Sequence, residues 1–202
     1  MAKNVIAQIH PPLYFFISTP GDKIWIVGGT KPIPNLDFSE LKEMKKKGDF
    51  SQLINSNWIN EFTKHIKSND TYLNTTEFVG LNQATEKGPT WPFRMSGHSM
   101  VKVNETTVYV IGGTHESNNN ESTNLTWIAD FSNGFKVKKG PRLLTERTGH
   151  CSAMMKIGGK TILVTVGGIQ GDWYTSDRVD VELLDLSELP KPRWRKGKCY
   201  LQ

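Results

Sequence analysis

Residues 97–103 read GHSMVKV and residues 108–113 read VYVIGG, so a Gly-His pair opens one short apolar segment and a Gly-Gly pair closes the next. The same arrangement returns at residues 149–155 (GHCSAMM) and 162–168 (ILVTVGG). The two histidines, at positions 98 and 150, are 52 residues apart, and the Gly-Gly pairs, which start at 112 and 167, are 55 apart. Segments of this length, rich in β-branched and apolar residues and separated by turn residues, predict a strand hairpin that occurs twice.

The repeat extends on both sides of each hairpin. A Gly-Pro pair, at 88–89 and again at 140–141, starts 10 residues before the His of its repeat. A third apolar segment follows the Gly-Gly pair, at 125–131 in one copy and 179–186 in the next, and the latter alternates apolar and polar residues as a two-faced strand does. A fourth short segment carries an aromatic residue, Phe135 or Trp194. The sequence therefore predicts four strands in each repeat.

A degenerate copy precedes these two. Residues 13–17 (LYFFI) and 23–29 (KIWIVGG) flank a Pro-Gly-Asp turn at 20–22, and residues 71–78 could supply a third strand. The Gly-His opening is missing from this copy. We therefore expect three repeats, at about 10–96, 97–148 and 149–198.

The first repeat is longer than the others because a different pattern interrupts it. Between 37 and 68, apolar residues recur at intervals of three or four, which is the spacing of an amphipathic helix. We expect a helical insertion at 37–68 in the loop between the second and third strands. It either packs its apolar stripe on the sheets or offers that stripe to a partner.

The Gly-Pro, Gly-His and Gly-Gly pairs, with the strand segments around them, resemble the kelch repeat. The resemblance covers residues 10–198 and is firmest over 97–198. Kelch resemblance implies four-stranded blades arranged radially about a channel, and a role in binding other macromolecules. Because propellers close with four to eight blades, three repeats leave the ring open. The expected fold is all-β: one domain over 1–202, an incomplete kelch-type β-propeller of about three blades and a fragment of a larger propeller.

The resemblance also assigns structural roles. It implies that the histidines opening the repeats tie neighbouring strands together, while the glycines allow tight backbone packing near the channel. The structural repeat residues are Gly28, Gly29, Gly97, His98, Gly112, Gly113, Gly149, His150, Gly167 and Gly168.

The loops that leave each Gly-Gly pair, at 30–38, 114–124 and 169–178, would lie on one face of a propeller, where ligand selectivity is expected. Trp173 and Tyr174 are the strongest candidates, because exposed aromatic residues dominate interface energy. Alternatively, both fold back onto their own sheet. The full set of binding candidates is His115, Glu116, Asn118, Gln170, Asp172, Trp173 and Tyr174.

Catalytic and cofactor patterns are weak. No second ligand stands at zinc or copper spacing from any of the histidines, and no phosphate-binding loop follows a Gly-Gly pair. We expect neither an enzyme nor a cofactor or metal. The net charge of +5 comes from a basic stretch after Glu188, which we interpret as a solvated strand edge and not as a nucleic-acid site. There is no apolar run long enough to span a membrane.

Five Asn-X-Ser/Thr triplets favour an extracellular setting slightly over a cytoplasmic one, although Asn and Thr also form such triplets as ordinary turn residues. The two cysteines, Cys151 and Cys199, could pair, but their separation in sequence does not establish this. The candidate glycosylation sites are Asn69, Asn74, Asn104, Asn120 and Asn124.

The leading hypothesis is a non-catalytic protein-interaction module with an unidentified protein partner. The kelch resemblance also permits an intracellular adaptor, such as a ubiquitin-ligase substrate receptor or an actin-binding protein. A copper enzyme fragment similar to galactose oxidase is a third class, although no matching Tyr, His and Cys ligand set can be assembled here.

Overall fold

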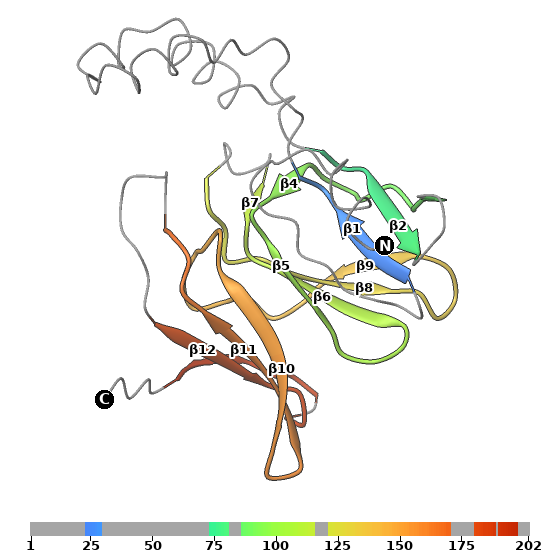
Figure 1. Cartoon of the computed structure of the whole chain (residues 1–202). Helices are drawn as coiled ribbons and strands as arrows, with labels where there is room; N and C mark the ends of the chain where they lie inside the picture. Colours follow the sequence, from blue (N-terminus) through green and yellow to red (C-terminus); the bar gives the residue numbers. More distant parts are fainter. Residues whose placement is uncertain are drawn as a thin grey trace, which may run out of the picture.

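The computed structural model describes residues 23–29, 73–80, 86–115, 121–170, 180–188 and 190–197, and within these ranges every regular element is a β-strand (Figure 1). The strands form antiparallel sheets, so the expected all-β class is confirmed. The expected helical insertion at 37–68 and the expected strand at 13–17 lie outside the described residues. Among those residues, no helix is long and apolar enough to cross a membrane.

The middle sheet has four strands in the order β5-β6-β8-β9. These are β5 (Ser99–Lys102), β6 (Thr107–Ile111), β8 (Thr126–Asp130) and β9 (Lys136–Lys139). Each strand pairs with its sequence neighbour in an antiparallel register, such as Ser99 with Ile111. The four strands occupy the positions that the sequence predicts for the repeat at 97–148.

The last sheet repeats this plan one unit later, in the order β10-β11-β12-β13. Its strands are β10 (Cys151–Ile157), β11 (Lys160–Val166), β12 (Val181–Asp185) and β13 (Trp194–Lys196). Two glycines with positive φ, Gly158 and Gly159, form the tight turn of the β10–β11 hairpin. Because β10 pairs with β11 over seven residues, this hairpin is longer than its counterpart in the middle sheet.

The first sheet contains β1 (Lys23–Val27), β2 (Thr76–Gly80) and β3 (Glu86–Lys87) among the described residues. The strand expected at 71–78 is displaced: β2 begins at Thr76, while Leu73 makes an isolated bridge to Met95. The cause is the linker before the middle sheet, which occupies the backbone of Leu73. In that linker, β4 (Met95–Ser96) pairs with β7 (Thr114–His115).

Two separate apolar clusters lie between successive sheets, because alternate residues of each strand face opposite sides. The first cluster joins Trp25 and Val27 of the first sheet to Met100, Val110 and Trp127 of the middle sheet. The second cluster joins the opposite face of the middle sheet to the last sheet, and its members are Val101, Tyr109, Ile111, Leu143, Leu163, Leu184 and Trp194. The middle sheet is therefore covered on both faces.

Candidate functional site

The residues that open and close the repeats meet at the junctions between sheets. The N–H of Gly113 donates to the carbonyl of Arg147 (2.8 Å), so the end of one sheet contacts the linker into the next. A Cβ atom on Gly112 would lie 2.6 Å from that same carbonyl oxygen and 2.6 Å from Cε1 of His150. Gly112 and Gly113 also have φ values of 59° and 93°, which side chains other than glycine rarely adopt. Glycine is thus required both for its conformation and for the close approach.

Side chains join the first strands of the middle and last sheets, β5 and β10, near their starts. The Ser99 hydroxyl lies 2.8 Å from Nε2 of His150 and also contacts the hydroxyl of Ser152. Ser152 in turn lies 2.6 Å from the hydroxyl of Thr165. Ser99 is fully buried and His150 is 1 % exposed, so this Ser-His pair bridges two sheets and does not present a nucleophile at the surface.

Both repeat histidines are held in the neutral form. Burial lowers the pKa of His98 to about 4. Burial, with smaller contributions from the charges of Arg147 and His98, lowers the pKa of His150 to about 3. At neutral pH each ring therefore occupies its junction uncharged, and the protonated form would place an unpaired charge inside the protein.

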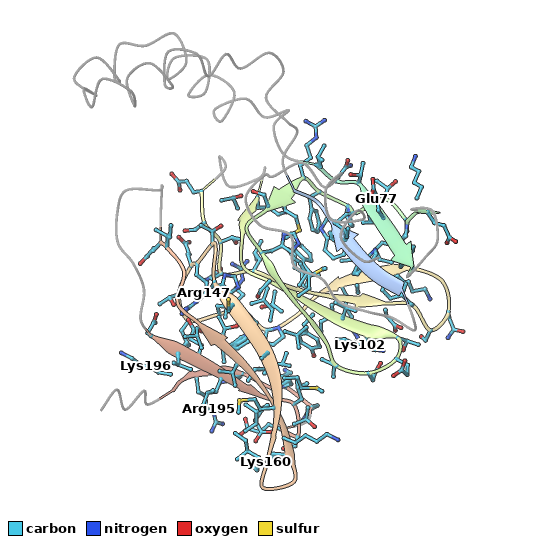
Figure 2. All side chains as sticks on the ribbon, in the orientation of Figure 1. Glu77, Lys102, Arg147, Lys160, Arg195 and Lys196 are labelled. Carbon is cyan, nitrogen blue, oxygen red and sulfur yellow. The ribbon has the colours of Figure 1, made fainter. Side chains whose placement is uncertain are left out.

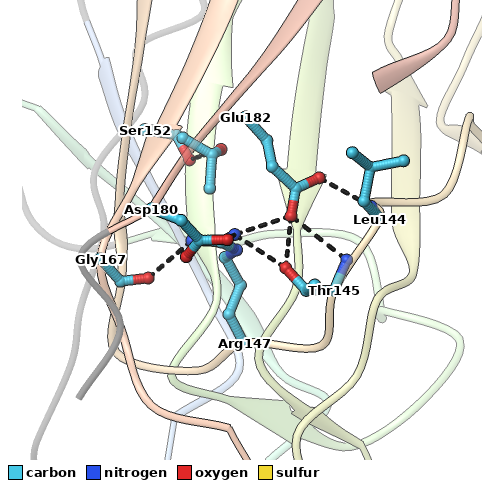
Figure 3. Close-up of polar contacts among 8 residues, drawn as sticks. Leu144, Thr145, Arg147, Ser152, Gly167, Asp180 and Glu182 are labelled. Atoms are coloured by element: carbon cyan, nitrogen blue, oxygen red, sulfur yellow. Dashed lines mark hydrogen bonds and ion pairs between the residues drawn. The ribbon is translucent and has the colours of Figure 1, made fainter. Parts of the chain in front are cut away.

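A buried ion pair holds the linker before His150 (Figure 3). Nη2 of Arg147 lies 2.7 Å from Oε1 of Glu182 and 3.3 Å from Oδ2 of Asp180, while Nη1 donates to the Gly167 carbonyl (2.8 Å). The Arg147 side chain is fully buried and that of Glu182 is 1 % exposed. Glu182 also accepts hydrogen bonds from the backbone N–H groups of Leu144 and Thr145. The linker is thereby fixed to β12.

Sequence reasoning missed Arg147 and Glu182, although a signal existed in the repeat. Counted from the Gly-His pair, Arg147 stands where the preceding repeat has Met95. Glu182 is opposite Thr165 just as Trp127 is opposite Val110, and both pairs lie at the same distance from Gly-Gly. Met95 and Trp127 belong to the first apolar cluster. Arg147 and Glu182 thus put opposite charges at the positions of two apolar residues, and this exchange is the sequence signal for the ion pair.

The loop candidates are only partly described. His115 belongs to β7 and is 4 % exposed; its ring packs against Phe93 (centroids 4.6 Å apart) and stacks on Trp127 (6.2 Å). Gln170 is exposed just after Gly-Gly. The remaining candidates lie outside the described residues: Glu116, Asn118, Asp172, Trp173 and Tyr174.

The asparagine triplets have different environments. Asn104 is exposed in the β5–β6 turn, where its Oδ1 accepts from the backbone N–H groups of Thr106 and Thr107 (both 2.9 Å). Asn124 is half-buried and its Oδ1 accepts from Arg142 (3.0 Å). Asn74 is also half-buried, and Asn69 and Asn120 lie outside the described residues. Cys151 has a free, exposed thiol, and Cys199 lies outside as well.

The face of the last sheet that points away from the middle sheet is apolar and exposed. We call it the leading face; the register also places Lys160, Asp185 and Arg195 on it, and its nine apolar residues are Cys151, Ala153, Met155, Ile157, Ile162, Val164, Val166, Val181 and Leu183. Met155, Ile157 and Val166 are 48 %, 50 % and 43 % exposed. In the middle sheet, Ile111 and Tyr109 stand at the positions of Val166 and Val164 and are 0 % and 8 % exposed, because the last sheet covers them.

Metal chemistry finds no support in the described ranges, where no group of three or more His, Cys, Asp or Glu side chains could hold an ion. No protein-family model matches the chain and no curated protein matches it. The kelch resemblance therefore rests on the repeat residues of the sequence.

The buried histidines predict that stability falls as the solution is acidified below neutral pH. An unfolded chain binds protons at its histidines near pH 6.5, whereas the folded chain resists protonation until about pH 4 at His98 and about pH 3 at His150. The contribution of each neutral, buried histidine to the free energy of unfolding is complete above pH 6.5. It is lost progressively as pH falls from 6.5 toward the pKa of that histidine in the folded chain, by at most about 1.4 kcal/mol per pH unit for each histidine.

Urea unfolding between pH 7.5 and 5, measured by tryptophan fluorescence, should show this slope in the whole chain, and His150→Gln should reduce it. An unchanged slope in the variant would exclude His150 as a source of the acid sensitivity.

The ion pair predicts that substitutions of Arg147 and Glu182 have non-additive effects on the free energy of unfolding. Arg147→Met leaves Glu182 buried without its cation and should lower the free energy of unfolding by about 3–5 kcal/mol. Adding Glu182→Leu removes the stranded carboxylate, so the double variant should recover more than half of this loss. Chemical denaturation of the two single variants and the double variant measures the coupling. If the losses simply add, the pair is not coupled.

Proposed function

We propose that this chain is part of a kelch-type β-propeller and acts as a non-catalytic protein-interaction module. The supporting observation is a junction contact that occurs twice, one repeat apart. The N–H of Gly29 donates to the Met95 carbonyl (3.0 Å), as the N–H of Gly113 donates to the Arg147 carbonyl (2.8 Å). Stacking that repeats with one offset is how blades are added around a propeller axis.

The second glycine of each Gly-Gly pair also lies unusually close to neighbouring backbone, in both repeats. A Cβ atom on Gly113 would lie 2.6 Å from the Ser96 carbonyl and 2.9 Å from Cβ of His98. A Cβ atom on Gly168 would lie 2.7 Å from the Thr148 carbonyl and 2.8 Å from Cβ of His150. Each glycine thus packs on the backbone that opens its own repeat. Equal contacts at equal positions favour one structural unit used repeatedly over unrelated sheets that happen to pack together.

The exposed leading face supports a larger propeller. Its residues repeat the apolar character of the face that the middle sheet buries, and a patch of neighbouring exposed apolar side chains commonly marks an interface. In this proposal a further four-stranded sheet covers the leading face in the complete molecule, as the last sheet covers the middle one. The described residues supply three such sheets, fewer than the four to eight blades that close a ring.

Partner binding is assigned to the loops that leave the Gly-Gly pairs. In this proposal the loops lie on one side of the stack, as the kelch resemblance implies, and carry the selectivity for the partner. Gln170 is exposed there, and Trp173 and Tyr174 follow in the same loop. Two aromatic residues within a polar loop are the composition expected of a binding hot spot.

The close approach of Gly113 to the backbone that opens its own repeat can be tested against Gly134. Gly113 (φ 93°) and Gly134 (φ 78°) both have positive φ, but a Cβ atom on Gly134 would meet nothing within 4 Å. Gly113→Ala should therefore destabilise the chain by roughly 1–3 kcal/mol more than Gly134→Ala, since only the first adds a steric clash to backbone strain. Equal losses, measured by urea unfolding, would contradict the close approach at Gly113 and remove the support that it gives to a repeated structural unit.

The binding role is tested by affinity capture with the complete polypeptide, immobilised and exposed to extract from its source tissue, with quantitative comparison of retained proteins. Trp173→Ala/Tyr174→Ala should lose specific proteins that the unmodified chain retains. Leu144→Ala is the matched control, because Leu144 is 55 % exposed but lies in the linker before the last sheet. Unchanged retention by the loop variant would eliminate this site.

A further inference from the structure

Positive charge is concentrated in two parts of the sequence. Residues 131–145 and 189–202 contain no Asp or Glu, yet carry four and five basic residues. With these nine removed from the 25 basic residues, the other 16 face 20 acidic ones, so the rest of the chain has a net charge of −4. The basic residues are Lys136, Lys138, Lys139 and Arg142, and then Lys191, Arg193, Arg195, Lys196 and Lys198.

The fold places both stretches at outer sheet edges. Strand β9 is the outermost strand of the middle sheet, and β13 is the outermost strand of the last sheet. Among the described residues, no strand pairs with the outer side of either. Figure 2 shows Arg195 and Lys196 at the margin of the last sheet. The other described basic residues of the two stretches are exposed as well: Lys136, Lys138, Lys139, Arg142, Lys191 and Arg193.

A hydrogen bond connects the two edges. Nε1 of Trp194, the first residue of β13, donates to the carbonyl of Pro141 (3.0 Å), which lies between Lys139 and Arg142. The end of β9 and the start of β13 are therefore neighbours. Lys138, opposite Ile128, and Lys196, opposite Glu182, lie on the faces that the middle and last sheets turn toward each other, and we treat the cations along the two edges as one surface. We call this surface, made of β9, residues 140–142 and residues 191–196, the basic margin.

Acidic side chains neutralise only part of the positive charge of the basic margin. Arg195 pairs with Glu188 (2.9 Å), and Arg142 donates to the neutral Asn124. Asp130 stands opposite Lys136 in the β8–β9 register. Lysine on an edge strand commonly prevents unwanted sheet pairing. That role explains charge on each edge separately, but it does not require both edges to lack acidic residues where they meet.

The chemistry of the margin favours an acidic polypeptide. Its aromatic rings, Trp127 beneath Lys139 and Trp194, are 8 % and 3 % exposed, so neither offers the open stacking surface that single-stranded nucleic acids use. The outer sides of β9 and β13 instead present backbone groups that an extended segment can pair with. We propose that the basic margin binds an extended acidic segment of a partner protein, with its carboxylates facing the cations of both strands. This binding requires neither a closed propeller nor the Gly-Gly loops.

Fluorescence anisotropy with the complete chain tests the proposal. The probe is a fluorescein-labelled peptide of about twelve residues with alternating Glu and Thr, a length of about 40 Å when extended. Binding should weaken as salt rises, because exposed charges are screened. Lys138→Glu in β9 and Lys196→Glu in β13 should each weaken binding about fivefold.

Lys156→Glu is the matched control, since Lys156 is an exposed lysine on β10 of the last sheet, outside the margin. Its dissociation constant should stay within about twofold of the unmodified chain. Margin variants that bind as well as the control would overturn the proposal. Equal affinity for a labelled thymidine oligonucleotide of the same charge would also overturn it, because the margin would then select charge and not polypeptide.

Discussion

The structure depends on the close approach between a Gly-Gly pair and the linker that leads into the following sheet. Gly113 donates its N–H to the Arg147 carbonyl, and a side chain at Gly112 would collide with that oxygen and with the ring of His150. This contact fixes where β10 begins relative to β6. Once it forms, Gly149 donates to the Gly97 carbonyl (2.8 Å) and the second apolar cluster is enclosed. A strand pair with bulkier residues at its end could not bring two sheets this close.

The two described junctions share this backbone contact, but different kinds of side chain pack next to it. Between the first and middle sheets, Met95 and Trp127 fill the space with apolar atoms. At the equivalent positions of the last sheet, Arg147 and Glu182 fill it with a hydrogen-bonded ion pair. Desolvating two charges makes the ionic version no more stabilising than an apolar one of similar volume. The ion pair differs from an apolar pair in making oriented hydrogen bonds. The Arg147 guanidinium also binds the Gly167 carbonyl and Asp180, which flank the 169–178 loop.

The sequence was sufficient to predict the strands of the last two repeats, because turn residues and apolar segments recur there at constant spacing. The third strands were expected at 125–131 and 179–186, and they are Thr126–Asp130 and Val181–Asp185. Local patterns could not reveal what depends on partners distant in sequence. His115 looks like a loop residue beside Glu116 and Asn118, yet it is buried, because Phe93 and Trp127 provide an aromatic site from other strands. The position of β2 was missed for the same reason: Leu73 bridges to Met95 of the linker strand β4, which the sequence pattern did not predict.

The contrast between the two faces of the last sheet follows from its position at one side of the described stack. The face with Leu163 and Leu184 is buried against the middle sheet, while the leading face remains exposed. Several positions of the leading face keep the apolar character of the covered face of the middle sheet, such as Val166 at the position of Ile111 and Ala153 at that of Val101, while Cys151 stands in place of Ser99. Ser99 is the hydroxyl that meets His150 at the described junction. A sheet that docked on the leading face in the same way would bring its own opening residue against a thiol, which is a weaker hydrogen-bonding group than a hydroxyl. Attraction at that junction would therefore come mainly from Ala153, Val164 and Val166, and less from a polar bridge between the first strands of the two sheets.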